Sequence, residues 1–221
     1  MHRQEMPEKN IPEFTPEQEW ANVVIHILGI VFGIIAIPFL ISLAAREEDV
    51  SRIFSMSIYG LCFLMVFTFS TLYHATKKER PKALCKRFDR ISIYFLIAGT
   101  YTPIIRYYLY NSTGIILLSV LWGFVILGIL FECFFFNRFN IFSVIFYLGM
   151  GLIFLFVPKH FFATMPWDIA MLVLTGVVLY CFGVIFYLWH KWKYHHAVWH
   201  LFVLIGGICH YTAMLQTVSL T

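Results

Sequence analysis

The chain has 221 residues, of which 60% are hydrophobic, 19% aromatic and 13% charged. Soluble domains average about 45–50% apolar and about 25% charged residues, so this composition excludes an ordinary water-soluble globule and indicates a membrane protein. The net charge of +4 comes from basic residues grouped between apolar segments rather than along a stripe, and we expect no nucleic-acid partner. The five cysteines form no CxxC pair, which argues against a disulfide framework and a thiolate metal site.

Seven apolar segments follow a polar N-terminal stretch, and each is close to the length of about 20 residues that a helix needs to cross a bilayer. The first 19 residues carry acids and lack the basic-then-apolar order of a signal peptide, so we expect no cleaved leader and interpret residues 1–18 as a polar tail. Residues 19–221 are predicted to form one all-α, seven-helix transmembrane domain. The expected helices are residues 20–45, 53–76, 88–106, 114–133, 139–157, 168–189 and 196–218.

Two local features qualify this outline. Pro38 lies inside the first segment and predicts a kink in its far half. Residues 77–87, between the second and third segments, form the most basic stretch of the chain and are interpreted as a loop.

The basic residues indicate how the bundle is oriented. If the N-terminus is cytoplasmic and seven helices alternate, the cytoplasmic side holds most of the 16 lysines and arginines. The positive-inside rule then predicts a cytoplasmic N-terminus, a C-terminus outside, and a multi-pass protein of the plasma membrane. The cytoplasmic set is Arg3, Lys9, Lys77, Lys78, Arg80, Lys82, Lys86, Arg87, Arg90, Arg138, Lys191 and Lys193, and the opposite set is Arg46, Arg52, Arg106 and Lys159.

Ionisable residues gather at the predicted cytoplasmic edge. His196 and His200 open the last helix four residues apart, which places both imidazoles on one face, one turn apart. Ser70 and His74 have the same spacing where the second helix ends, and Asp89 lies where the third begins. We therefore expect three imidazoles, a carboxylate and a hydroxyl to arrive at one depth from three helices.

These residue types suit a catalytic zinc site. Three imidazole nitrogens at about 2.0–2.1 Å leave a fourth position for water, and zinc lowers the pKa of that water toward about 7. Asp89 could orient the water and take its proton, and Ser70 could support a ligand or a developing oxyanion. Each residue alone also has an ordinary interpretation. A histidine at an interface can be a polar anchor, Asp89 can pair locally with Arg87 or Arg90, and Ser70 can bond to a carbonyl of the preceding turn.

Motifs along nearly the whole chain after residue 17 resemble the hemolysin III branch of the progestin and adiponectin receptor family, which is grouped with alkaline ceramidases. The resemblance implies seven helices and a zinc ion held by His74, His196 and His200. It also implies that Asp89 contacts the zinc's water and that Ser70 lies close by. The motifs are residues 19–26 (EWANVVIH), Ser70 with His74, Phe88 with Asp89, residues 97–103 (IAGTYTP), residues 196–204 (HAVWHLFVL) and residues 209–211 (CHY).

Several further residues receive weaker predictions. Arg90 stands where many members of the resembled branch carry a histidine, so that position has no expected role. Asn22 and His26 share a face of the first helix and could line the cavity beneath the metal, or form an interhelical hydrogen bond. His210 lies about 21 Å along the axis from the start of the last helix and cannot share the ion. Glu132 lies at a predicted helix exit, where we expect a solvated side chain.

Two classes of function fit these residues. The first is an intramembrane zinc hydrolase that cleaves an amide or ester bond of a membrane lipid. The second is a non-catalytic receptor or sensor with structural zinc, or a pore-forming cytolysin, possible as a homo-oligomer. A transporter ranks third, because charged residues near the bilayer midplane, which usually mark ion paths, are absent. Kinship with ceramidases favours the hydrolase, although a shared fold does not by itself determine chemistry.

Overall fold

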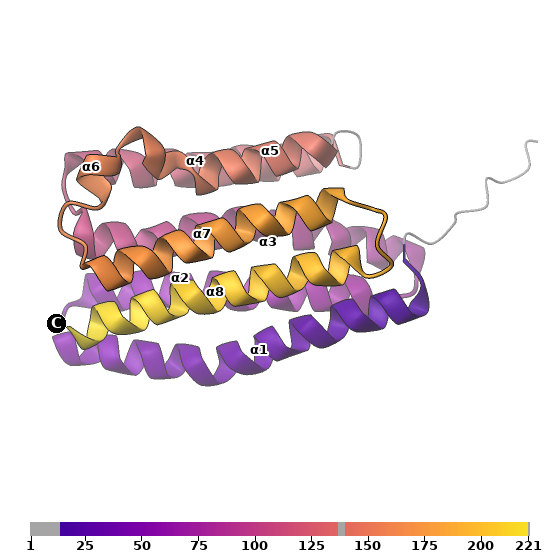
Figure 1. Cartoon of the computed structure of the whole chain (residues 1–221), viewed down its shortest axis with the longest axis horizontal. Helices are drawn as coiled ribbons and strands as arrows, with labels where there is room; N and C mark the ends of the chain where they lie inside the picture. Colours follow the sequence, from indigo (N-terminus) through magenta and orange to yellow (C-terminus); the bar gives the residue numbers. More distant parts are fainter. Residues whose placement is uncertain (1–13, 137–139, 221) are drawn as a thin grey trace, which may run out of the picture.

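The computed structural model of the chain describes residues 14–136 and 140–220, and in those ranges it contains helices and no strand. Seven helices have twelve residues or more, as the sequence predicts, and together they form an all-helical membrane bundle (Figure 1). The elements are α1 (Pro16–Ala44), η1 (Ala45–Glu47), α2 (Val50–Ala75), α3 (Glu79–Tyr108), α4 (Ser112–Phe134), α5 (Asn140–Gly151), η2 (Ile153–Phe156), α6 (Pro158–Phe161), α7 (Trp167–Leu188) and α8 (His195–Ser219).

Five of these helices are long and apolar enough to cross a membrane: α1 with η1, α2, α4, α7 and α8. α3 is the longest helix, with 30 residues, but carries more polar and charged side chains. Large apolar side chains cover the outside of the bundle, for example Phe156 with 86% and Ile35 with 70% of its surface exposed. Contact between these apolar side chains and water is unfavourable, whereas contact with the hydrocarbon chains of lipid is not.

α1 begins four residues earlier than the sequence predicts. The Thr15 side chain accepts a hydrogen bond from the Gln18 backbone, and the Gln18 side chain accepts one from the Thr15 backbone, which completes a capping box. Pro16 occupies the first helical turn, where its missing N–H has no cost. Residues 14–18 therefore belong to the bundle and not to the expected tail, and the rest of that tail lies outside the described residues. The helix continues through Pro38 to Ala44.

The basic stretch predicted as a loop is largely helical. α3 starts at Glu79, so only a short connection separates it from α2. Pro81 suggested a break, yet it occupies the first turn of α3, where proline is tolerated. The prediction of a loop over residues 77–87 was wrong for this reason. The extra turns carry Lys82 and Lys86 to the end of α2, where both lie over the ring of Tyr73.

The fifth predicted helix is interrupted. α5 ends at Gly151, and a 3₁₀ turn (η2) and the short α6 follow it. Gly149 and Gly151 weaken the last turn of α5, since glycine loses more conformational freedom in a helix than other residues. The Tyr101 hydroxyl donates a hydrogen bond of 2.7 Å to the Gly151 carbonyl, which satisfies one carbonyl group where the helix stops. The expected single helix over residues 139–157 is thus two shorter elements.

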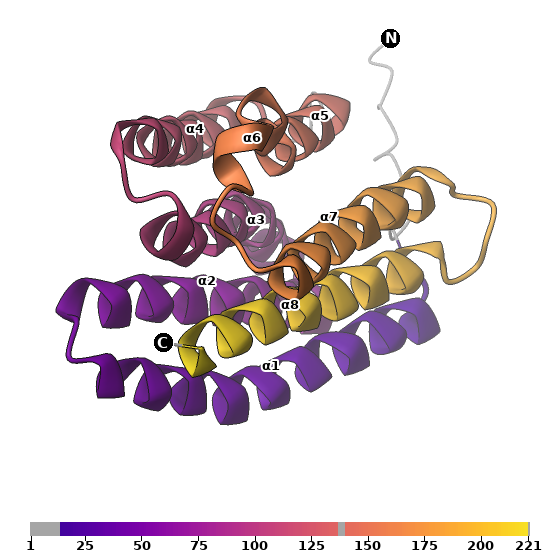
Figure 2. The same ribbon diagram turned by 60° about the vertical axis from the view of Figure 1, so that its left-hand side comes forward.

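The helices are arranged as neighbouring antiparallel pairs. α8 lies between α1 and α7, and α3 lies between α2 and the α4–α5 edge, as both views show (Figures 1 and 2). The starts of α1, α3 and α8 and the end of α2 meet at one end of the bundle, and the C-terminus lies at the other (Figure 1). Three parts of the chain that are far apart in sequence therefore share one end: the start of α1, the α2–α3 connection and the start of α8.

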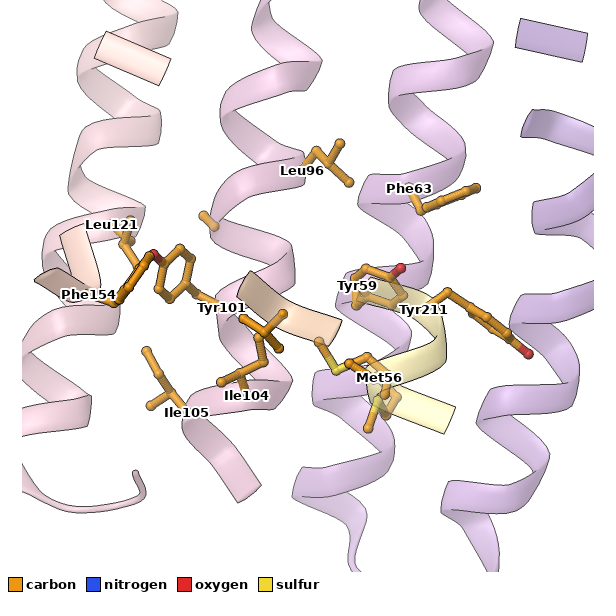
Figure 3. Close-up of a cluster of buried hydrophobic side chains, with 14 of the residues drawn as sticks. Met56, Tyr59, Phe63, Leu96, Tyr101, Ile104, Ile105, Leu121, Phe154 and Tyr211 are labelled. Atoms are coloured by element: carbon orange, nitrogen blue, oxygen red, sulfur yellow. The ribbon is translucent and has the colours of Figure 1, made fainter. Parts of the chain in front are cut away.

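The core lies between α2, α3 and α8. Tyr59 and Phe63 from α2 and Tyr211 from α8 are buried together with Tyr101 and its neighbours from α3 (Figure 3). The hydroxyls of these three tyrosines each donate to a backbone carbonyl, and that of Tyr59 reaches the Gly207 carbonyl at 3.3 Å. This packing fixes α2 against α8, which sets the distance between the histidines that the two helices carry.

Candidate metal centre

Four histidines meet at the shared end of the bundle. His26 comes from α1, His74 from the end of α2, and His196 with His200 from the start of α8. The ring of His200 contacts the other three: its centroid lies 4.0 Å from that of His26, 5.1 Å from that of His74 and 4.4 Å from that of His196. The sequence-based convergence of α2 and α8 histidines is seen in the structure.

Three of these histidines form a group that could hold a metal ion. The ligand atoms of His26, His74 and His200 all lie within 4.8 Å of one another, and all three side chains are buried. The Nε2 atoms of His74 and His200 are 3.1 Å apart. Two nitrogens that each bind one zinc at about 2.0–2.1 Å in tetrahedral geometry lie about 3.3 Å apart. The donor atoms of His74 and His200 are therefore spaced as two ligands of a single small ion, and the donor atom of His26 lies within 4.8 Å of both.

His196 lies beside the group formed by His26, His74 and His200. It is partly buried on the first turn of α8, with its ring centroid 5.4 Å from that of His74. Its nitrogens fall outside the group of ligand atoms within 4.8 Å, whereas those of His26 fall inside it. His26, which the sequence suggested only as a lining residue, is thus better placed toward His74 and His200. His26 reaches this position because α1 packs closely against α2.

Ser70 and Asp89 lie beside the histidines. Ser70 is buried one turn before His74 on α2, and its side chain hydrogen-bonds to the Asp89 carboxylate on α3. Asp89 also interacts electrostatically with His74. Ser70 thus orients a carboxylate next to a candidate ligand, in addition to any bond within its own helix.

Glu19 is a functional candidate that the sequence reasoning missed. Its Oε2 atom lies 2.6 Å from Nδ1 of His74, so the imidazole N–H donates to the carboxylate and Nε2 remains directed at His200. A carboxylate behind a ligating histidine fixes its tautomer and ring orientation. The signal was present in the sequence, because Glu19, Asn22 and His26 are spaced three and four apart and share a face of α1.

Asn22 also contacts His74 at the same nitrogen. Its Nδ2 atom is 3.2 Å from Nδ1, while its Oδ1 atom has no hydrogen-bond partner among the described residues. An N–H that donates to Glu19 cannot accept from an amide, so the amide turned by 180° satisfies both groups better. Asn22 then supports the same tautomer of His74 as Glu19 does.

Lys82 holds Glu19, which contacts His74, in place. Its Nζ atom lies 2.6 Å from Oε1 of Glu19 and donates to the carbonyls of Tyr73 and Thr76 at 3.2 Å each. Those carbonyls belong to the last turn of α2 and the residue after it, where backbone acceptors lack helical partners. The helical start of α3 is what brings Lys82 to this position. One lysine thereby connects α1, α2 and α3 next to the histidines.

A cavity of about 440 Å³ reaches the histidines from within the bundle. Its polar end includes Ser70, Asp89, His196 and His200. Phe14 closes this end, with its ring centroid 4.6 Å from that of His196. The remaining walls come mainly from α3, α5 and α7 and are mostly aliphatic and aromatic, including Val66, Ile93, Ile97, Leu148, Leu152, Val177, Val184 and Leu188.

Two other predicted residues lie away from the cluster. The expectation of a solvated Glu132 was wrong: it is fully buried, with Oε1 3.0 Å from Nη2 of Arg90 and 2.7 Å from the Ser143 hydroxyl. The sequence could not show that α3 and α5 cover this end of α4. His210 is buried against α7 with Nε2 3.2 Å from the Val173 carbonyl, outside the metal-binding group.

The fold and the site together define a multi-pass helical membrane protein whose histidine cluster could hold a metal ion. Comparison with known proteins gives the family. The family described as "Haemolysin-III related" matches residues 14–211, and the chain belongs to it. The sequence is 37% identical to the "Hemolysin-3 homolog" of Bacillus subtilis (strain 168) over 202 residues, which cover 91% of this chain and 95% of that protein.

Two further relatives support this assignment. "Hemolysin-3" of Bacillus cereus is 36% identical over 191 residues, covering 86% of this chain and 87% of that protein. The human "Monocyte to macrophage differentiation factor" is 27% identical over 201 residues, covering 88% of this chain and 82% of that protein. The resemblance to hemolysin III within the progestin and adiponectin receptor superfamily is confirmed.

Proposed function

We propose that this protein is a zinc-dependent hydrolase that cleaves an amide or ester bond of a membrane lipid. One observation carries the proposal: clustered buried histidines lie with Asp89 and Ser70 at the polar end of an otherwise apolar cavity. A metal site at such a place serves a substrate that has both a polar bond to cleave and a hydrocarbon chain to accommodate. Membrane lipids have this chemistry.

The residues divide into ligands and supporting groups. His74 and His200, together with His196 as the sequence predicts, would hold the zinc, and the structure adds His26 beside them. Bound zinc supplies a Lewis acid and lowers the pKa of a water molecule to about 7. Glu19 and Asn22 keep His74 in the tautomer whose Nε2 faces the ion.

Asp89 is assigned the role of general base. It lies beside His74 and is held by Ser70, so its orientation is fixed before substrate arrives. A carboxylate in this position can take a proton from water and return it to the leaving nitrogen or oxygen. Ser70 is thereby a positioning residue for Asp89. The aliphatic walls exclude bulk water from the reacting bond.

The test is lipid turnover by purified protein. Zinc-loaded wild type is offered a panel of amide and ester lipids, and released fatty acid is measured. Asp89→Asn should lower the rate about 10²–10⁴-fold, the usual contribution of a general base, without loss of bound zinc. Asp168→Asn, at the other end of the bundle on α7, is the matched control and should keep the wild-type rate. Absence of turnover on every lipid by zinc-loaded wild type would remove the hydrolase proposal.

A second candidate is membrane permeabilisation, which the names of the two Bacillus hemolysin relatives suggest. It makes a different prediction for the histidines. Dye release from liposomes that persists in His74→Ala would favour a pore in which metal chemistry has no part. Dye release that is absent in wild type would leave the hydrolase as the better account.

A further inference from the structure

We propose that His26 is the fourth ligand of the metal ion, so that four imidazoles close the resting centre. This inference rests on the proposed zinc site and concerns how that site is regulated. His26 is 1% exposed, and among the described residues neither Nδ1 nor Nε2 has a hydrogen-bond partner. The sequence allowed an interhelical hydrogen bond for this residue, and the structure provides none.

An unpartnered imidazole in an apolar interior is unfavourable, because its polar atoms lose water and gain nothing in return. A metal ion removes that cost for one nitrogen. The ligand atom of His26 already lies within 4.8 Å of those of His74 and His200. Its ring centroid is 4.0 Å from that of His200 and 6.0 Å from that of His74. A buried histidine with free nitrogens therefore faces two candidate ligands of the same ion.

Five of the six separations among the four rings suit ligands of one tetrahedral ion, whereas the rings of His26 and His196 make no contact among the described residues. With metal–nitrogen bonds of about 2.0–2.1 Å, the ring centroids of two ligands lie about 5 Å apart. The other separations are 5.1 Å for His74–His200, 5.4 Å for His74–His196 and 4.4 Å for His196–His200. These five separations lie within about an ångström of this value.

The fold places His26 there by close packing of α1 on α2. Gly29 follows His26 by one turn, and a Cβ atom at that position would overlap the ring of Phe67. The ring of Phe67 in turn lies 5.6 Å from that of His26. Glycine permits the two helices to approach, and Phe67 then limits the movement of the imidazole. His26 is thus held beside His74 independently of any hydrogen bond.

Closure has a chemical consequence. A site with four protein ligands is inert toward small molecules, whereas catalytic zinc sites keep one position open. One imidazole must therefore leave before substrate or water can bind. His196 is the exchangeable ligand, because it is only partly buried and its nitrogens lie outside the tight group. The metal centre would have four protein ligands at rest. It would gain an open position when a substrate or another small molecule displaces His196 from the ion.

Cobalt substitution tests this coordination directly. Protein loaded with Co²⁺ in place of Zn²⁺ is compared by visible absorption and X-ray absorption before and after addition of azide. Wild type should show four nitrogen ligands and little response to azide, and His26→Ala should respond to azide and bind Zn²⁺ at least roughly 100-fold more weakly. By comparison, loss of a residue that only hydrogen-bonds to a metal ligand weakens metal affinity about 10–100-fold. His210→Ala, which also removes a buried imidazole, should behave as wild type.

Other outcomes separate the two proposals. Wild type that binds no metal would remove the zinc site itself. Wild type that binds metal, with His26→Ala unchanged in Zn²⁺ affinity and in cobalt spectrum, would overturn only the role of His26. If His26→Ala does not fold, His26→Gln keeps a polar side chain of similar size and takes its place. In wild type, an immediate azide complex with all imidazoles still bound would also contradict a closed centre.

Discussion

The buried ion pair between Arg90 and Glu132 gives a prediction about stability that can be worked from the structure. Glu132 is fully buried, and its Oε1 atom accepts hydrogen bonds from Arg90 at 3.0 Å and from Ser143 at 2.7 Å. Arg90 also donates to Ser143 at 2.8 Å, and Tyr147 donates to the Arg90 carbonyl at 3.0 Å. These contacts join α3, α4 and α5 beside the cavity.

Glu132→Ala removes the carboxylate that balances Arg90 and leaves a cavity. Breaking one partner of a buried pair costs about 3–5 kcal/mol, because the remaining charge stays in a poorly solvated place. In a chain of this size, each kcal/mol corresponds to about 2–4 °C in melting temperature, so we expect a fall of roughly 10 °C. Ser143→Ala removes a neutral hydroxyl from the same network and should cost about 1 kcal/mol.

The control replaces both charges at once. Arg90→Met with Glu132→Leu keeps the volume, removes the desolvation cost and should recover most of the lost stability. Melting of detergent-purified variants, followed by loss of helical circular dichroism, measures these effects. The reasoning is refuted if Glu132→Ala melts at the same temperature as wild type, or if the double variant melts as low as Glu132→Ala.

Three further predictions address the outer shell, the packing and the pH dependence. Glu19→Gln should weaken Zn²⁺ binding about 10–100-fold in equilibrium titrations while leaving the melting temperature of the metal-free protein nearly unchanged; equal affinities would contradict its role behind the ligand. Gly114→Ala would push a methyl group into a backbone carbonyl and should destabilise by about 1–3 kcal/mol, whereas Gly123→Ala meets open space and should stabilise slightly; equal melting temperatures would contradict this. The Ser51 hydroxyl holds the pKa of Asp49 below its ordinary value of 3.8. The ionised Asp49 carboxylate therefore contributes its full stabilisation of the fold above about pH 4, and this contribution is lost as the pH falls through the pKa of Asp49 in the folded protein. In Asp49→Asn the melting temperature should therefore depend less on pH in that range than in wild type, and an unchanged pH dependence would contradict this role of Asp49.

Composition and apolar runs were sufficient to predict the helical membrane bundle, because a chain without water around it must satisfy its backbone within helices. The positions of helix ends were less predictable. Pro81 indicates a break in isolation but is harmless in a first turn, so the first turns of α3 looked like a loop. The end of α5 depends on glycines and on a bond from Tyr101, a tertiary contact that local sequence does not reveal.

For the candidate site, helical spacing and alternation were enough to bring His74 and His200 together. They were not enough to rank His26 against His196. That ranking depends on how closely α1 approaches α2, which Gly29 and the shape of Phe67 decide. Glu19 was overlooked because acids before an apolar run are usually solvated. The burial of Glu132 likewise depends on two neighbouring helices that its own segment does not specify.

The metal content of the purified protein tests the central claim most directly. Protein prepared from zinc-supplemented cells and washed free of loose metal is measured by elemental analysis, per mole of chain. Wild type should carry about one zinc ion, the expectation for a single tetrahedral centre. His200→Ala should carry almost none, and His210→Ala should keep the wild-type amount. A metal-free wild type, or a His200→Ala variant with as much zinc as wild type, would contradict the account.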